Sequence, residues 1–168
     1  MRRALAAVAA LALAACASGP ETAAEDARVA RVVDGDTIEL AGGERVRLVQ
    51  VDAPEAQEDE CYAAESAAAL ERLLPPGAPI RLEADPRLDD IDRFDRLLRY
   101  VHRDDVNVNL ELVRRGAASV WFFDGDRGRY ADALLAAARA AEEGELGLWG
   151  ACPAARLDPE RGVDTGRP

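Results

Sequence analysis

Short runs of alternating apolar and polar residues open the folded part of the chain. Their apolar positions include Val29, Ile38, Leu40, Val46 and Leu48, and Asp-Gly and Gly-Gly pairs separate the runs. An alternation with a period of two is typical of half-buried strands, and such pairs are typical of tight turns. The pattern predicts three strands in a meander, near residues 28–33, 36–41 and 44–51.

Helices and further strands are predicted after this meander. Residues 60–74 are rich in Ala, Leu and Glu and end at a Pro-Pro-Gly sequence, which is a helix stop signal. Similar patterns predict strands at 80–83 and 97–102, a short helix at 107–115, an extended piece at 118–123 and a helix at 130–143. Five strands with about three interspersed helices favour an α+β fold around a small closed barrel of the OB type.

The first residues are typical of a bacterial export signal. Arg2 and Arg3 precede an apolar core over residues 4–15, which is shorter than the roughly 20 residues that span a bilayer. The core ends at Cys16 behind two alanines, an order that resembles the lipobox of bacterial lipoproteins, whose Cys carries the lipid. An ordinary signal peptide that contains a Cys is the alternative. We expect an exported protein that its lipid anchors to a membrane of the cell envelope.

Composition divides the rest of the chain. Small polar residues after Cys16 predict a flexible linker, and the residues after Cys152 include too few apolar side chains to form a core. We therefore expect a signal peptide at 1–15, the lipidated Cys and linker at 16–27, one folded domain at 28–152 and a disordered tail at 153–168.

Acidic residues outnumber basic ones. The 168 residues include 32 Asp and Glu and 21 basic residues, all of them Arg, for a formal net charge of −11. This balance argues against the large basic groove that dominates affinity in many nucleic-acid-binding proteins, but not against a small site for one phosphate. Arg suits bidentate phosphate contacts, and a GC-rich coding bias produces the same preference for Arg.

Two cysteines, Cys61 and Cys152, remain beside Cys16. Outside the cytoplasm, a single pair of cysteines usually forms a disulfide. We expect a bond between Cys61 and Cys152, and two free buried thiols are the alternative.

Three polar clusters interrupt the apolar runs. They are the turn at 34–36, the stretch 47–55 and the stretch 92–96. Each has a plain structural interpretation, as a turn, a strand with a solvated face and a charged loop. Together, however, they contain the parts that metal-assisted hydrolysis of a phosphodiester requires.

Carboxylates at strand ends can hold a hard dication, which prefers several oxygen ligands. Asp36 and Asp52 provide two such carboxylates. Arg47 and Arg96 can stabilise the negative charge that develops on a phosphodiester during cleavage. Glu55 can orient or deprotonate a water molecule.

One geometric condition follows from this set. Strict alternation along a strand places Arg47 and Asp52 on opposite faces. They share a site only if the strand twists, bulges or ends between them, and we expect a bend near Gln50.

Six stretches resemble the staphylococcal nuclease (thermonuclease) family, in the family's order. They are VVDGDTIEL, VRLVQVDAPE, ECYAAESAAALERLL, DRFDRLLRYVH, VNLELVRRGAASV and GELGLWG, and the resemblance covers roughly residues 29–150. The resemblance implies a five-stranded OB-type barrel with helices around it. It also implies calcium-dependent cleavage of DNA and RNA that leaves 3′-phosphates. We expect single-stranded or denatured DNA and RNA as partners, and a monomer.

The resemblance assigns roles around the metal. Asp36 and Asp52 would bind calcium through their carboxylates, and Ala53 would bind it through its backbone carbonyl. Glu55 would act on the attacking water, and the choice between general base and positioning group stays open. In the turn at 34–36, Asp34 would mainly shape the backbone.

Two groups of residues would bind substrate. Arg47 and Arg96 would hold the scissile phosphate and stabilise the transition state. Arg93 and Phe94 match positions that contact a terminal phosphate in the family, although Phe lacks a hydrogen-bond donor. Asp95 stands where the family often has Gly.

Trp121 and Phe122 lie where aromatic side chains of the family stack on a base, and both are equally suited to a place in the core.

Three functions are compatible with these features: a lipid-anchored nuclease, a non-catalytic nucleic-acid-binding module, and a structural envelope lipoprotein with a calcium-stabilised domain. The presence of all five metal-binding and catalytic side chains favours the nuclease.

Overall fold

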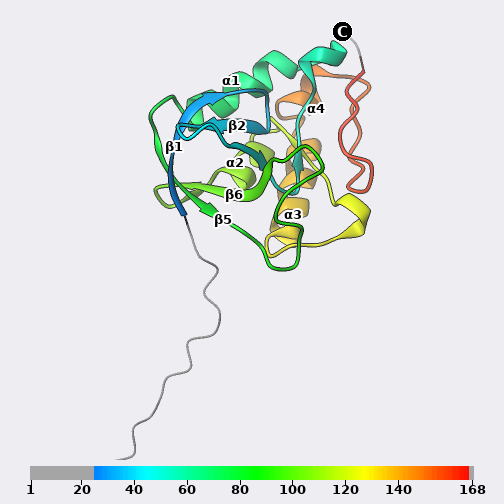
Figure 1. Ribbon diagram of the computed structural model, residues 1–168. Helices are drawn as coiled ribbons and strands as arrows, with labels where there is room; N and C mark the ends of the chain where they lie inside the picture. The colour runs from blue at the N-terminus through cyan, green and yellow to red at the C-terminus, as the bar shows by residue number, and fades with distance from the viewer. Residues whose placement is uncertain (1–24, 167–168) are drawn as a thin grey trace, which may run out of the picture.

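The computed structural model describes residues 25–166 and has a closed barrel at its centre (Figure 1). Five strands form it: β1 (Glu25–Val32), β2 (Thr37–Leu40), β3 (Arg45–Leu48), β5 (Pro79–Glu83) and β6 (Leu97–Arg103). Their hydrogen-bonded order is β3-β2-β1-β5-β6, and a parallel pairing of β3 with β6 closes the ring. The other barrel pairings are antiparallel, which confirms the predicted OB-type α+β fold.

Tight turns join the first three strands, as the sequence predicts. Between β1 and β2, the amide of Asp36 donates to the carboxylate of Asp34 at 3.1 Å, so Asp34 shapes the turn. Between β2 and β3, Gly43 has a φ of +95°, a conformation that glycine adopts at little cost. The alternating side chains of Ile38 and Val46 are fully buried inside the barrel.

The predicted bend is present at Gln50. Its φ of +62° lies in the left-handed region, so the chain leaves β3 and takes a new direction in β4 (Val51–Asp52). β4 pairs with β8 (Ser119–Val120) instead of a barrel strand. The bend is fixed by the buried Gln50 side chain, which accepts a 2.7 Å hydrogen bond from the Tyr100 hydroxyl.

The described residues contain four α-helices: α1 (Ala63–Leu73), α2 (Val108–Arg114), α3 (Ala131–Glu143) and α4 (Leu148–Ala151). In Figure 1, α1 lies above the barrel, and α3 and α4 lie to its right. The remaining short elements are the 3₁₀ turns η1 (Ala56–Glu58) and η2 (Phe123–Gly125) and the strand β7 (Val106–Asn107). All predicted helices are present. The first begins later than predicted because Tyr62, with a φ of +73°, interrupts the helical path.

Two clusters of buried side chains hold these elements together. The larger cluster fills the barrel and extends to the helices, where it includes Leu70, Leu112 and Leu134. The smaller cluster surrounds Trp149 and also includes Ala155. Because Ala155 lies beyond the predicted end of the domain, this second cluster ties C-terminal residues to the fold.

The residues 153–166 differ from the disordered tail that their composition predicts. They run along the side of the molecule that carries α4, in red in Figure 1. Thr165 is 2% exposed, and the amide of Phe122 donates to the carbonyl of Pro159 at 2.7 Å. Backbone hydrogen bonds and the disulfide at Cys152 hold this segment, and the few apolar side chains that it has, such as Ala155, pack on a cluster that other parts of the chain supply.

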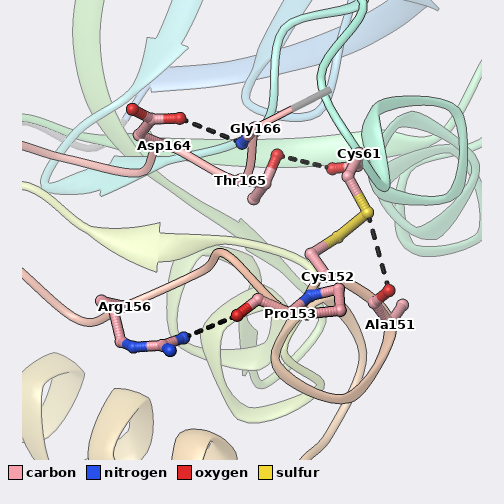
Figure 2. The surroundings of a disulfide bond; sticks show 8 residues. All are labelled: Cys61, Ala151, Cys152, Pro153, Arg156, Asp164, Thr165 and Gly166. Atoms are coloured by element: carbon pink, nitrogen blue, oxygen red, sulfur yellow. Dashed lines mark hydrogen bonds between the residues drawn. A yellow bond between two sulfur atoms is a disulfide. The ribbon is translucent and has the colours of Figure 1, made fainter. Parts of the chain in front are cut away.

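The predicted disulfide joins Cys61 and Cys152, whose Cα atoms lie 5.9 Å apart. Figure 2 shows that the far end of the C-terminal segment returns to the same place, where the Thr165 hydroxyl donates to the carbonyl of Cys61 at 2.8 Å. The amide of Cys61 donates to the carbonyl of Gly166, also at 2.8 Å. The chain from Cys152 to Gly166 is therefore a loop closed at Cys61.

The folded domain begins earlier than predicted. The first residues of β1 pair with β5, Glu25 opposite Leu82 and Ala27 opposite Ile80, so the linker predicted at 16–27 overlaps this strand. The predicted signal peptide, Cys16 and the start of the linker lie outside the described residues. Within residues 25–166, no helix is both long enough and apolar enough to cross a bilayer.

Candidate active site

Three of the predicted site residues meet beside the Gln50 bend. Asp36 directly precedes β2, Arg47 lies in β3 and Asp52 ends β4. The Nη2 atom of Arg47 lies 3.0 Å from Oδ2 of Asp36 and 2.8 Å from Oδ1 of Asp52. One guanidinium therefore bridges the two carboxylates that the sequence predicts as metal ligands.

The Arg47 side chain also holds the bend. Its Nη1 atom donates to the carbonyl of Leu48 at 2.8 Å and to the carbonyl of Val51 at 2.6 Å, on either side of Gln50. Only 8% of the side chain is exposed, so its charge is removed from water and depends on these partners. The same group therefore fixes the backbone and neutralises the two carboxylates.

Asp36 is the most deeply buried of the predicted metal ligands. Its Oδ2 accepts a 2.9 Å hydrogen bond from the amide of Ala53, and its Oδ1 accepts one of 3.1 Å from the Thr37 hydroxyl. Burial raises the pKa of Asp36 to about 7. Arg47 opposes this effect and neighbouring carboxylates add to it, so a further positive charge here would favour the anionic form.

Asp52 is held from two directions. Its Oδ1 binds Arg47 in the barrel, and its Oδ2 accepts a 2.8 Å hydrogen bond from the amide of Val163 in the C-terminal segment. Burial raises the pKa of Asp52, although both of these donors favour its anion. The carboxylate is therefore ordered by donors on both of its oxygens.

Glu55 stands at the start of the loop that follows Asp52, and it is half-buried. Its amide donates to the carboxylate of Glu60 at 2.6 Å, which fixes the beginning of η1. Burial raises the pKa of the Glu55 carboxyl, and the nearby charge of Asp34 raises it further. A carboxylate with a raised pKa is suited to accept a proton from water.

The metal-binding capacity of the site rests on few protein ligands. Within residues 25–166, no group of three or more His, Cys, Asp or Glu side chains is arranged to hold a metal ion. The available protein ligands are the carboxylates of Asp36 and Asp52 with the backbone carbonyl of Ala53. Such a set suits a hard cation that keeps several water molecules.

Arg96 reaches the same site from the start of β6. Its amide and its Nε donate to the carboxylate of Asp92 at 3.0 and 2.6 Å. These hydrogen bonds lower the pKa of Asp92, although burial opposes them. The Nη1 atom of Arg96 makes a long 3.5 Å contact with the Thr37 hydroxyl, which itself donates to Asp36. Both predicted arginines thus lie next to the buried carboxylate, one directly and one through Thr37.

The predicted phosphate-contacting residues before Arg96 form an exposed aromatic platform. Phe94 is 62% exposed, and the guanidinium carbons of Arg93 and Arg96 lie 4.7 and 5.3 Å from the centre of its ring. Asp95 has a φ of +60°, a conformation that glycine favours and that Asp tolerates. The backbone at this position therefore accounts for the Gly that the family often has there.

The two aromatic residues predicted to stack on a base are placed differently. Phe122 is 3% exposed and belongs to the core, so its ring is not accessible to a base. Trp121 is half-buried, and its ring meets that of Phe123 edge-on with 5.4 Å between the centres. Phe123 is 59% exposed, so Trp121 and Phe123 form the accessible pair.

Within residues 25–166, sequence reasoning missed two hydrogen-bond donors to the predicted ligand carboxylates, Thr37 and Val163. Thr37 follows Asp36 directly, so its place in the same motif was the available signal. Val163 acts through its backbone amide and lies far from Asp52 in the sequence, so no side-chain pattern could identify it.

Most of the site lies in a part of the chain that resembles a known protein family. The model of the family described as "Staphylococcal nuclease homologue" matches residues 45–151, a range that contains Arg47, Asp52, Glu55 and Arg96. Asp36 lies before the start of this match.

Individual relatives agree with this match. The chain is 34% identical over 136 residues to Endonuclease YhcR of Bacillus subtilis. The aligned part is 72% of this chain and 11% of that protein. It is 40% identical over 98 residues to an uncharacterized endonuclease of Escherichia coli, which covers 56% of this chain and 60% of that one. A thermonuclease of Staphylococcus intermedius is 29% identical over 138 residues, which covers 79% of this chain and 80% of that protein.

The chain spans about a tenth of the first of these relatives and less than two thirds of the second. The family match, in contrast, extends over more than half of this chain and over most of the site described above. The chain belongs to the staphylococcal nuclease homologue family.

Proposed function

We propose that the chain is a calcium-dependent nuclease that hydrolyses phosphodiester bonds of DNA and RNA and leaves 3′-phosphates. The observation that carries the proposal is the bridge between Asp36, Arg47 and Asp52. Arg96 joins this bridge through Thr37. Relatives named endonuclease and thermonuclease support a nuclease activity.

The residues present fit a calcium ion. Two carboxylates share one guanidinium, and Asp36 is only 1% exposed with a pKa raised to about 7. With both carboxylates ionised, two negative charges face one positive charge, and this net negative charge favours a bound cation. Asp36 and Asp52 would hold calcium through their carboxylates and Ala53 through its carbonyl, and water would complete the roughly six to eight oxygen ligands that calcium takes. When bound, calcium supplies positive charge that neutralises the phosphate.

The side chains around the carboxylates divide the remaining work. Glu55 orients the attacking water or accepts its proton, in accordance with the raised pKa of its carboxyl. The water oxygen bonds to phosphorus, its proton passes to Glu55 or to solvent, and the bond to the 5′-oxygen breaks. A proton from solvent water converts the departing 5′-oxygen to a hydroxyl, which leaves a 3′-phosphate and a 5′-hydroxyl. Arg47 and Arg96 stabilise the additional negative charge on the phosphate during this step.

Exposed aromatic groups beside the site suit an unpaired strand. Stacking of a base on an aromatic ring contributes about 1–3 kcal/mol, and it requires bases that are free of a duplex. Phe94, with its two arginines, and the pair of Trp121 and Phe123 offer such rings. We therefore propose single-stranded or denatured DNA and RNA as the substrates.

We also propose that the protein is exported and anchored to a membrane by a lipid on Cys16. The disulfide between Cys61 and Cys152 supports this proposal, because such bonds persist in oxidising compartments. Cys16→Ser should release the protein from the membrane fraction, and unchanged membrane partition of this variant would overturn the lipid anchor.

The central experiment measures cleavage of denatured DNA by the full chain, in calcium and in a chelator. Cleavage should depend on calcium, and Asp36→Asn should remove most of it because a ligand loses its charge. Asp132→Asn is the matched control, since its side chain is 99% exposed and lies on the surface of α3. Full activity of Asp36→Asn at limiting calcium would overturn the site. Binding of DNA without cleavage would favour the non-catalytic module.

A further inference from the structure

The C-terminal strap, as we name residues 153–166, begins just after the family match ends at residue 151. Both of its ends are fastened to Cys61. The disulfide holds Cys152 at one end, and hydrogen bonds to the backbone of Cys61 hold Thr165 and Gly166 at the other (Figure 2). The strap is therefore a closed loop with a fixed base, and its middle part can be held in a defined place.

The middle of the strap lies against the candidate active site. The amide of Phe122 donates to the carbonyl of Pro159 at 2.7 Å, which docks the strap beside the accessible aromatic pair. The amide of Val163 donates to Oδ2 of Asp52 at 2.8 Å. A segment outside the family match thus supplies a direct hydrogen bond to a proposed metal ligand.

This hydrogen bond completes the support of Asp52. The barrel provides Arg47 for one carboxylate oxygen, and the strap provides the Val163 amide for the other. Each oxygen of the Asp52 carboxylate accepts a hydrogen bond from a donor with a fixed position. Because both bonds must be met at once, the plane of the carboxylate has one favourable orientation. Partners of this kind orient metal ligands, and their loss typically lowers metal affinity by about 10–100-fold.

Gly162 shows how closely the strap approaches Asp52. It has a φ of +79°, and a Cβ atom at this position would lie 2.5 Å from Oδ2 of Asp52. Such a separation is too short for a non-bonded carbon and oxygen, so any larger residue must displace either the strap or the carboxylate. Glycine is thus required for the backbone to come near enough to donate from Val163.

We propose that the C-terminal strap positions Asp52 for the metal and that Val163 is the positioning residue, through its backbone amide. This inference rests on the proposed function, because it takes Asp52 as a calcium ligand. The strap contributes no ligand of its own. It raises calcium affinity by holding Asp52 in the orientation that the bound metal needs.

The first test is Gly162→Ala in the full chain, with calcium affinity measured by titration calorimetry. The added methyl group should push the Asp52 carboxylate away and weaken calcium binding about tenfold or more. Gly77→Ala is the matched control, because Gly77 has a φ of +82° and no atom within 4 Å of the added Cβ. It introduces the same backbone strain far from Asp52, so its calcium affinity should equal that of the wild type.

A second pair of variants removes the donor itself. Val163→Pro has no backbone N–H to donate, whereas Val163→Ala keeps the N–H and shortens the side chain. Calcium binding about tenfold or more weaker in the Pro variant than in the Ala variant would support the inference, because the two differ in the N–H group, and equal binding would overturn it. This pair decides the question if Gly162→Ala does not fold in the chelator.

A double-mutant cycle with Asp52→Asn separates positioning from a general effect on folding. If the strap acts through the Asp52 carboxylate, Gly162→Ala should lower calcium affinity much less in the Asp52→Asn protein than in the wild type. Equal losses in both would overturn the inference, as would wild-type affinity of folded Gly162→Ala. A wild-type chain that does not bind calcium overturns the proposed metal and this inference together. Wild-type binding that Gly162→Ala matches overturns only the role of the strap.

Discussion

Removal of the positive charge of Arg47 should destabilise the calcium-free protein far more than the loss of a surface ion pair. The Nη2 atom of Arg47 pairs with Asp36 and Asp52, and its Nη1 atom donates to the two carbonyls that flank the bend. Arg47→Gln would leave two carboxylates facing each other without a cation. It would also leave two carbonyl groups without their donor.

The magnitude follows from burial. Breaking a buried ion pair by removing one partner costs about 3–5 kcal/mol. The side chain of Asp52 is 21% exposed, which places the expected loss near the lower end, at about 3 kcal/mol at pH 8. This is a large part of the roughly 5–15 kcal/mol by which a typical domain is stable.

The loss should depend on pH with a definite sign. The pKa of Asp36 in the folded protein, about 7, lies above its ordinary value of 3.8, so the folded state favours the protonated form. The stability that this protonation contributes is complete below the ordinary pKa and is lost as the pH rises through about 7. A protonated Asp36 is neutral and has no charge for Arg47 to balance. Arg47→Gln should therefore be most destabilising above about pH 7 and less destabilising near about pH 6.

The assay is urea unfolding of the full chain in a chelator, at about pH 6 and about pH 8. Arg31→Gln is the control, because Arg31 pairs with Glu39 at the surface with 54% of its side chain exposed. That variant should lose at most about 1 kcal/mol. Calcium should stabilise Arg47→Gln more than it stabilises the wild type, since it replaces the lost charge. Equal stability of Arg47→Gln and the wild type at pH 8 in chelator would refute this account of the bridge.

Two further results are expected. Arg96→Lys keeps the charge but loses the planar fork, so kcat should fall about tenfold or more, which corresponds to about 1.4 kcal/mol of transition-state stabilisation. A kcat equal to that of the wild type would exclude a transition-state contact by Arg96. Calcium should bind about tenfold more weakly at pH 6 than at pH 8, because binding must displace the proton that Asp36 holds with its pKa of about 7. Calorimetry in buffers of different ionisation enthalpy detects the released proton, and an affinity that is independent of pH would contradict this expectation.

The fold could be predicted from the sequence because its elements have regular periods and clear stop signals. The meander is visible in the alternation around Ile38 and Val46, and the helices end at Gly or Pro. The bend at Gln50 was predicted in a different way, from the requirement that Arg47 and Asp52 share one site. That prediction was right because the chemistry of the site restricts the backbone more strongly than strand periodicity does.

Periodicity could not predict which of three consecutive aromatic residues is buried in the core. Trp121, Phe122 and Phe123 follow β8 directly and enter η2, so the chain leaves a regular element within this run. Outside a regular element there is no period that tells which ring points to the core. Phe122 is buried because its ring packs into the larger core cluster, and that packing joins side chains that are distant in sequence.

The order of the C-terminal strap shows what composition does and does not predict. A low content of apolar residues means that a segment cannot form a core of its own, but it does not exclude docking on a core that already exists. The strap docks through backbone hydrogen bonds, the Thr165 hydroxyl and a few apolar side chains such as Ala155. The disulfide brings Cys152 next to Cys61, so closing the loop at its far end costs less entropy than it would in the reduced chain. The disulfide was itself predicted from the sequence. A cysteine at the end of a domain that pairs with one near the catalytic loop is a reason to expect the residues after it to stay near that loop.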